Sequence, residues 1–84
     1  MPKNKNISNG ETLIGIVTPV QWDRDNRISA VGLSATDDEE YWIENGEKFL
    51  DLIQSRIEAV GKVRRDRKQS RSIFIKRYRV IEDE

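Results

Sequence analysis

The segment GEKFLDLIQS, residues 46–55, most limits what this chain can fold into. Its apolar residues Phe49, Leu50 and Ile53 recur at helical spacing, and charged or polar residues cover the other side. The other apolar stretches of the chain alternate or are rich in β-branched residues, as strands are. We therefore predict one short helix, of about two to three turns, within an otherwise β-rich chain.

Five segments with the character of strands flank this helix, three before it and two after it. They are residues 11–22 (ETLIGIVTPVQW), 27–35 (RISAVGLSA), 41–44 (YWIE), 56–63 (RIEAVGKV) and 72–81 (SIFIKRYRVI). Gly15 and Pro19 indicate that the first strand is bent. The last segment is apolar on both faces, which predicts a bend or a bulge. Residues 65–71 (RDRKQSR) are polar throughout and predict a loop.

The order strand, strand, strand, helix, strand, strand resembles the OB-fold, a five-stranded Greek-key barrel. The resemblance covers residues 11–81 and is architectural, without a family-specific motif. We expect a mostly β fold of this kind, a single OB-like barrel domain over residues 11–81. A flexible tail is expected at residues 1–10 and an acidic tail at residues 82–84. A small SH3-like barrel, or a five-stranded sheet with one helix, is the alternative.

The composition argues against several classes of function. The 84 residues include no cysteine and no histidine, so disulfides, thiolate metal sites and the commonest general base are absent. The hydroxyl groups of Ser34 and Ser72 have no evident base beside them. We expect a protein that is not an enzyme and that needs no cofactor or metal. With no apolar run resembling a signal peptide or a membrane span, we expect a cytoplasmic monomer or weak homodimer without membrane contact.

Charge is strongly segregated along a chain whose formal net charge is zero. Residues 1–61 carry six Lys/Arg against eleven Asp/Glu, whereas residues 62–81 carry nine Lys/Arg against one Asp. Such asymmetry indicates a site for a polyanion. In the alternative interpretation, acidic and basic strands neutralise each other across one sheet.

The resemblance implies a binding face on the second and third strands, flanked by the loops that join strands one to two and four to five. The predicted phosphate contacts are Arg64, Arg65, Arg67, Lys68, Arg71, Arg77 and Arg79, and the predicted stacking residues are Trp22, Tyr41 and Trp42. The predicted partner is single-stranded nucleic acid, bound weakly and with little sequence preference. The acidic turn WDRDN, residues 22–26, counts against phosphate binding.

The alternative function is a protein-interaction or structural module with no nucleic-acid ligand. Its partner would be an acidic protein or a second subunit, joined by charge or by pairing along an exposed strand edge. If the basic hairpin is only solvated and the tryptophans lie in the core, the protein-interaction module is favoured over nucleic-acid binding.

Overall fold

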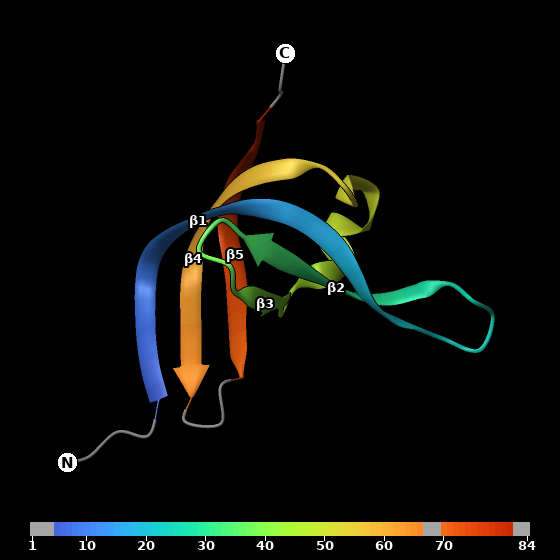
Figure 1. Ribbon diagram of the computed structural model, residues 1–84, viewed down its shortest axis with the longest axis horizontal. Helices are drawn as coiled ribbons and strands as arrows, with labels where there is room; N and C mark the ends of the chain where they lie inside the picture. The colour runs from blue at the N-terminus through green and yellow to red at the C-terminus, as the bar shows by residue number, and fades with distance from the viewer. Residues whose placement is uncertain (1–4, 67–69, 82–84) are drawn as a thin grey trace.

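The computed structural model describes the backbone of residues 5–66 and 70–81 and the side chains of residues 10–65 and 70–81 (Figure 1). The described chain is mostly β, with one short 3-10 helix. Its elements are β1 (Lys5–Trp22), β2 (Ile28–Ala35), β3 (Glu40–Ile43), η1 (Gly46–Leu52), β4 (Arg56–Asp66) and β5 (Arg71–Ile81). The predicted order of five strands, with one helix between the third and the fourth, is therefore confirmed.

The five strands form one sheet that closes in a ring, in the order β1-β2-β3-β5-β4. Neighbouring strands are antiparallel except β3 and β5, which are parallel. The long strand β1 bends so that it pairs with both β2 and β4, and Gly15 lies opposite Ala35 on one side and Ile57 on the other. A Cβ atom at Gly15 would collide with the backbone carbonyl of Ser34, so the bend needs glycine.

The core lies inside the ring and is filled by alternate residues of the strands. The largest fully buried side chains are Tyr41, Phe49, Leu33, Ile43, Ile57, Ile73, Val17, Val31 and Val63. Phe49 comes from η1 and is 2% exposed, and its ring meets that of Tyr78 edge-on at 5.0 Å. Thus η1 closes one end of the ring with a single aromatic side chain.

A β-bulge divides β5 into two halves. Gly61 of β4 pairs with Ile75, but its neighbour Val60 pairs with Arg77, so Lys76 is an extra residue in β5. Ahead of the bulge, Ile73 and Ile75 point into the core. The extra residue reverses which side chains point inward along the rest of the strand. This explains why the segment has apolar residues on both faces, and it confirms the predicted bulge.

The start of the first strand differs most from the prediction. β1 begins at Lys5 and not at Glu11, so residues 5–10, which were expected to belong to a tail, are part of this strand. The reason is that residues 5–8 pair with residues 63–66 of β4 through backbone groups, which need no apolar side chain. Residues 1–4 and 82–84 of the predicted tails lie outside the described residues. No helix in the described part of the chain is long and apolar enough to cross a membrane.

Replacing Phe49 by alanine tests the closure of the ring by η1. The variant leaves a cavity at a buried position, so the free energy of unfolding should fall by about 3–5 kcal/mol. Leu50→Ala is the matched control, because Leu50 is the next residue and is 40% exposed. Urea denaturation followed by tryptophan fluorescence measures both. Equal losses in the two variants would show that Phe49 does not close the ring.

Candidate functional site

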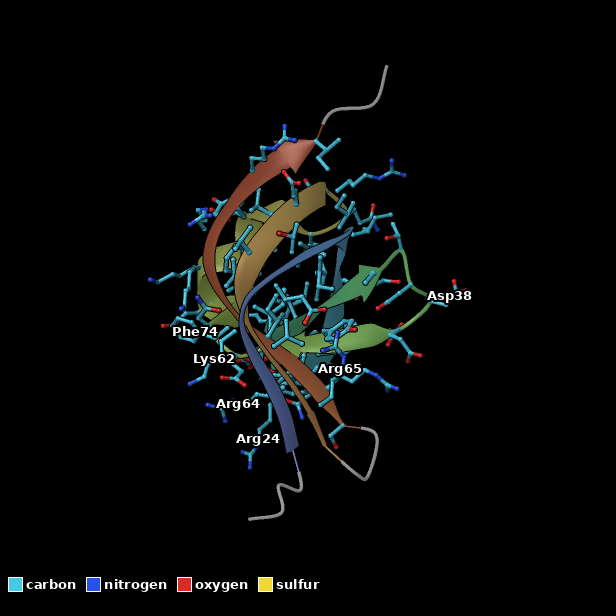
Figure 2. All side chains as sticks on the ribbon, turned by 90° about the vertical axis from the view of Figure 1, so that its left-hand side faces the viewer. Arg24, Asp38, Lys62, Arg64, Arg65 and Phe74 are labelled. Carbon is cyan, nitrogen blue, oxygen red and sulfur yellow. The ribbon has the colours of Figure 1, made fainter. Side chains whose placement is uncertain are left out.

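Arg64 and Arg65 are adjacent on β4 and point to opposite faces of the sheet (Figure 2). Arg64 lies on the outer face, as Lys62 and Phe74 do. Arg65 points to the inner face, at the end of the ring opposite η1. Strand alternation thus divides the predicted basic cluster between two surfaces.

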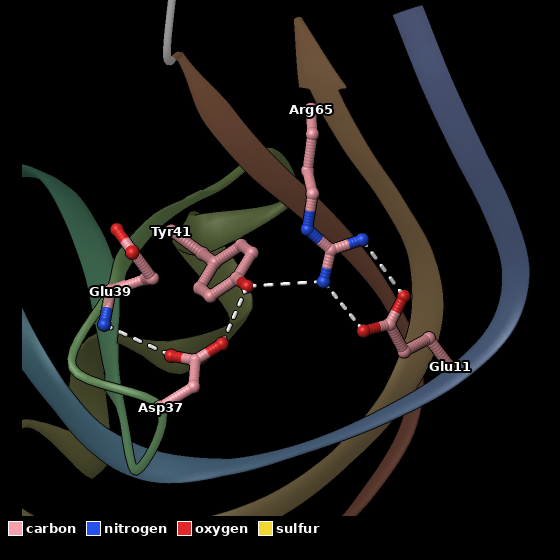
Figure 3. A network of polar contacts seen from close by, with 5 residues as sticks. All are labelled: Glu11, Asp37, Glu39, Tyr41 and Arg65. Carbon is pink, nitrogen blue, oxygen red and sulfur yellow. Dashed lines mark hydrogen bonds and ion pairs between the residues drawn. The ribbon is translucent and has the colours of Figure 1, made fainter.

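On the inner face, Arg65 belongs to a polar network (Figure 3). Its guanidinium donates two hydrogen bonds to Glu11, at 3.1 Å to Oε1 and 2.6 Å to Oε2. It also donates to the Tyr41 hydroxyl at 3.1 Å, and its Cζ lies 5.5 Å from the centre of the Tyr41 ring. The Tyr41 hydroxyl donates to Asp37 Oδ2 at 2.9 Å, and the other oxygen of Asp37 accepts from the Glu39 backbone N–H. The network closes the second end of the ring.

The network shifts two pKa values upward. Burial of the Tyr41 ring, helped by the carboxylate of Asp37, raises the pKa of its phenol above 10. The hydrogen bonds from Arg65 to Glu11 raise the pKa of the guanidinium above its usual range. Tyr41 is only 1% exposed, so its face cannot stack on a base. The prediction that Tyr41 is a stacking residue is therefore wrong: it packs in the core because the alternation of β3 turns it inward.

Three other described arginines each have a carboxylate partner. The distances are 3.6 Å for Arg64–Glu44, 3.2 Å for Arg71–Glu39 and 2.6 Å for Arg79–Glu58. These pairs agree with the interpretation that acidic and basic segments neutralise each other. Arg77 forms no ion pair with the described residues. Arg67 and Lys68, also predicted as phosphate contacts, lie outside them.

The outer face of β3 and β5 carries two exposed aromatic rings. Trp42 is 44% exposed and Phe74 is 43% exposed. Trp42 pairs with Ser72, two residues before Phe74 on β5, so the two rings lie on neighbouring strands. The sequence analysis missed Phe74, although its position between the buried Ile73 and Ile75 already indicated an outward side chain.

Basic side chains border this pair of rings. Lys62 and Arg64 of β4 lie opposite Phe74 and Ser72. A surface depression of about 320 Å³ is lined by Glu44, Lys62, Arg64, Phe74 and Lys76. We call Trp42 together with these five residues the aromatic face.

Within the aromatic face, Glu44 is the only carboxylate among three cations. Its Oε2 accepts a hydrogen bond of 2.6 Å from the Ser72 hydroxyl, and Arg64 Nε lies 3.6 Å from the same oxygen. That distance is too long for a hydrogen bond, and Arg64 Nε has no hydrogen-bond partner among the described residues. The Nε atom is itself buried, whereas the Arg64 side chain as a whole is 40% exposed.

The remaining predicted residue, Trp22, lies apart from this face. It is 55% exposed at the end of β1, in the β1–β2 hairpin that projects away from the loop end of β4 and β5 (Figure 1). In the adjoining turn, Asp23 Oδ1 accepts hydrogen bonds from the backbone N–H groups of Asp25 and Arg27. The Asp23 carboxylate thus serves the backbone of its own turn.

The raised pKa of Tyr41 predicts a loss of stability at alkaline pH. Because the folded-state pKa lies above the unfolded value, the neutral phenol stabilises the fold below about pH 10, and this contribution disappears as the pH rises through the raised pKa. Tyr41→Phe should therefore give a shallower decline of unfolding free energy above about pH 9 than the parent protein. Denaturant titrations over the alkaline range measure it. A parent-like decline in Tyr41→Phe would contradict the assignment.

Comparison of the chain with models of protein families, with curated proteins and with solved structures finds no match.

Proposed function

We propose that this domain binds single-stranded nucleic acid on its aromatic face, with low affinity and little sequence preference. The observation that carries the proposal is the pair of half-exposed rings, Trp42 and Phe74, bordered by cations. Binding without sequence preference needs flat apolar platforms for the bases and positive charge for the backbone. The aromatic face combines both on adjacent strands.

The two rings are neighbours on the outer face, because Trp42 pairs with Ser72 and Phe74 lies two residues further along β5. Each base presents a π-face whatever its identity, so stacking on Trp42 and Phe74 favours single strands over paired bases without selecting a sequence.

The cations of the face are placed for phosphate contacts. Lys62, Arg64 and Lys76 stand against one carboxylate, Glu44, so the face is net positive. Three phosphate contacts release few counterions, and the logarithm of the binding constant should fall with a slope of about −2 against the logarithm of salt concentration. This modest charge is the reason for proposing weak binding.

The sheet topology supports the same assignment. We infer that the ring is an OB-fold, because its order, its parallel β3–β5 contact and the helix between β3 and β4 are those of that fold. OB domains commonly hold oligonucleotides on the face formed by their second and third strands. Trp42 of β3 belongs to that face, and Phe74 extends it onto β5. The proposed role is binding, not catalysis.

An oligonucleotide titration of the single-tryptophan variant Trp22→Phe tests the stacking step. Trp42 is then the only tryptophan, and its fluorescence should be quenched as single-stranded oligonucleotide is added. Adding Phe74→Ala should weaken binding by about ten-fold, since a stacked base contributes about 1–3 kcal/mol. Tyr78→Ala is the matched control, because Tyr78 is equally exposed on the same strand, beyond the bulge. Equal losses in both variants, or no quenching, would refute the proposal.

Charge reversal tests the phosphate contacts. Lys62→Glu should weaken binding and reduce the salt slope by about 0.7, whereas Arg77→Glu makes the same change in net charge outside the face and should leave the slope unchanged. Titrations at several salt concentrations measure both. If the two variants weaken binding equally, the attraction is a property of overall charge and the aromatic face is not the site.

A further inference from the structure

The C-terminal half of β5 presents an open edge to solvent. On the side that faces away from β4, β3 pairs with β5 only at Ser72 and Ile73. Asn45 then takes the place of a strand: its side-chain amide donates to Ile75 O at 2.8 Å and accepts from Ile75 N at 3.0 Å. Beyond Ile75, no strand of the described chain lies along this edge.

The backbone groups that face this edge can be identified. Ile75 directs its N–H and C=O toward Asn45, away from β4. The bulge adds Lys76, and the antiparallel ladder resumes with the pairs Val60–Arg77 and Glu58–Arg79. Because the direction of the backbone groups alternates along a strand, those of Tyr78 and Val80 point to the open edge.

The side chains along this edge alternate in character. Arg77 and Arg79 lie on the outer face, whereas Tyr78 and Val80 lie on the other face and are 45% and 43% exposed. A surface depression of about 310 Å³, lined by Glu58, Val60, Arg77, Tyr78 and Arg79, lies over the paired part of β4 and β5 beside this half of the strand. Charged residues alone guard an edge against aggregation; here they alternate with exposed apolar residues that a partner strand would cover.

We propose that this edge binds an extended segment of a partner protein in which acidic residues alternate with apolar ones. The segment adds a strand beside β5 and bonds to the backbone of Tyr78 and Val80. Its acidic side chains lie on the outer face beside Arg77 and Arg79, and its apolar side chains cover Tyr78 and Val80. The site is separate from the aromatic face and does not depend on nucleic-acid binding.

Charge favours this occupant over a second copy of the chain. Residues 71–81 contain no carboxylate, so two copies paired over this strand bring Arg77 close to further cations and not to an acidic residue of the opposite strand. Arg77 has no ion-pair partner among the described residues, so an acidic side chain of the partner segment can form an ion pair with it. A basic segment would be repelled.

A synthetic peptide of alternating glutamate and valine, labelled with a fluorophore, tests the proposal by anisotropy with the full chain. It should bind, whereas a peptide with lysine in place of glutamate, and one of equal composition with the glutamates grouped, should bind at least ten-fold more weakly. Amide hydrogen exchange gives the second measurement. The N–H groups of Tyr78 and Val80 should gain protection with peptide, while those of Arg77 and Arg79 should already be protected without it.

Two variants and one control locate the binding. Val80→Pro removes an N–H that faces the edge and no ladder bond, so it should abolish binding and leave the fold intact. Arg77→Glu breaks no ion pair among the described residues and should weaken binding by roughly three- to ten-fold; it serves alone if Val80→Pro does not fold. Phe74→Ala should bind the peptide as the parent does. Failure of the alternating peptide to bind, or dimerisation through this edge seen by sedimentation, would overturn the proposal.

Discussion

The short parallel contact between β3 and β5 is the constraint on which both proposed surfaces depend. It consists of two residue pairs, Trp42–Ser72 and Ile43–Ile73, and it closes the ring. The contact brings Trp42 beside Phe74 and so creates the aromatic face. Because it is short, it also leaves β5 beyond Ile75 with β4 as its one neighbouring strand among the described residues. One two-residue contact therefore determines where the rings gather and where the backbone stays open.

Charged residues of this chain stabilise the fold together with its small hydrophobic core. Only 36% of the residues are apolar, and the ring has two ends to close. Phe49 closes one end by burial, while Arg65, Glu11, Tyr41 and Asp37 close the other by hydrogen bonds. A bidentate arginine–carboxylate pair is among the stronger polar contacts and fixes both side chains in one geometry. Arg65, which belongs to the basic segment predicted to bind a polyanion, thus stabilises the fold through its bonds to Glu11.

The sequence predicted the fold better than the candidate site. Period 2 in residues 56–63 and helical spacing around Phe49 are local signals, and both gave the right elements. The structural role of Arg65 depends on Glu11, which is 54 residues away in the chain, and no local pattern indicates such a pair. The same holds for the hydrogen bond between Arg65 and Tyr41 and for the ion pair of Arg64 with Glu44, which lies in the turn after β3. Phe74 is different, because the alternation along β5 already indicates that its side chain points away from those of Ile73 and Ile75.

The bulge at Lys76 separates the two surfaces of β5. In a regular strand, Phe74, Tyr78 and Val80 would all share one face, because their positions have the same parity. The extra residue turns Phe74 outward beside Lys62 and turns Tyr78 toward Phe49 on the inner side. One strand can therefore present an aromatic ring with cations on its first half and an open backbone edge on its second half. The close approach of β4 and β5 at the bulge needs Gly61, since a Cβ atom there would overlap the carbonyl of Phe74. Gly61 thus permits the bulge, and the bulge allows β5 to carry two kinds of surface.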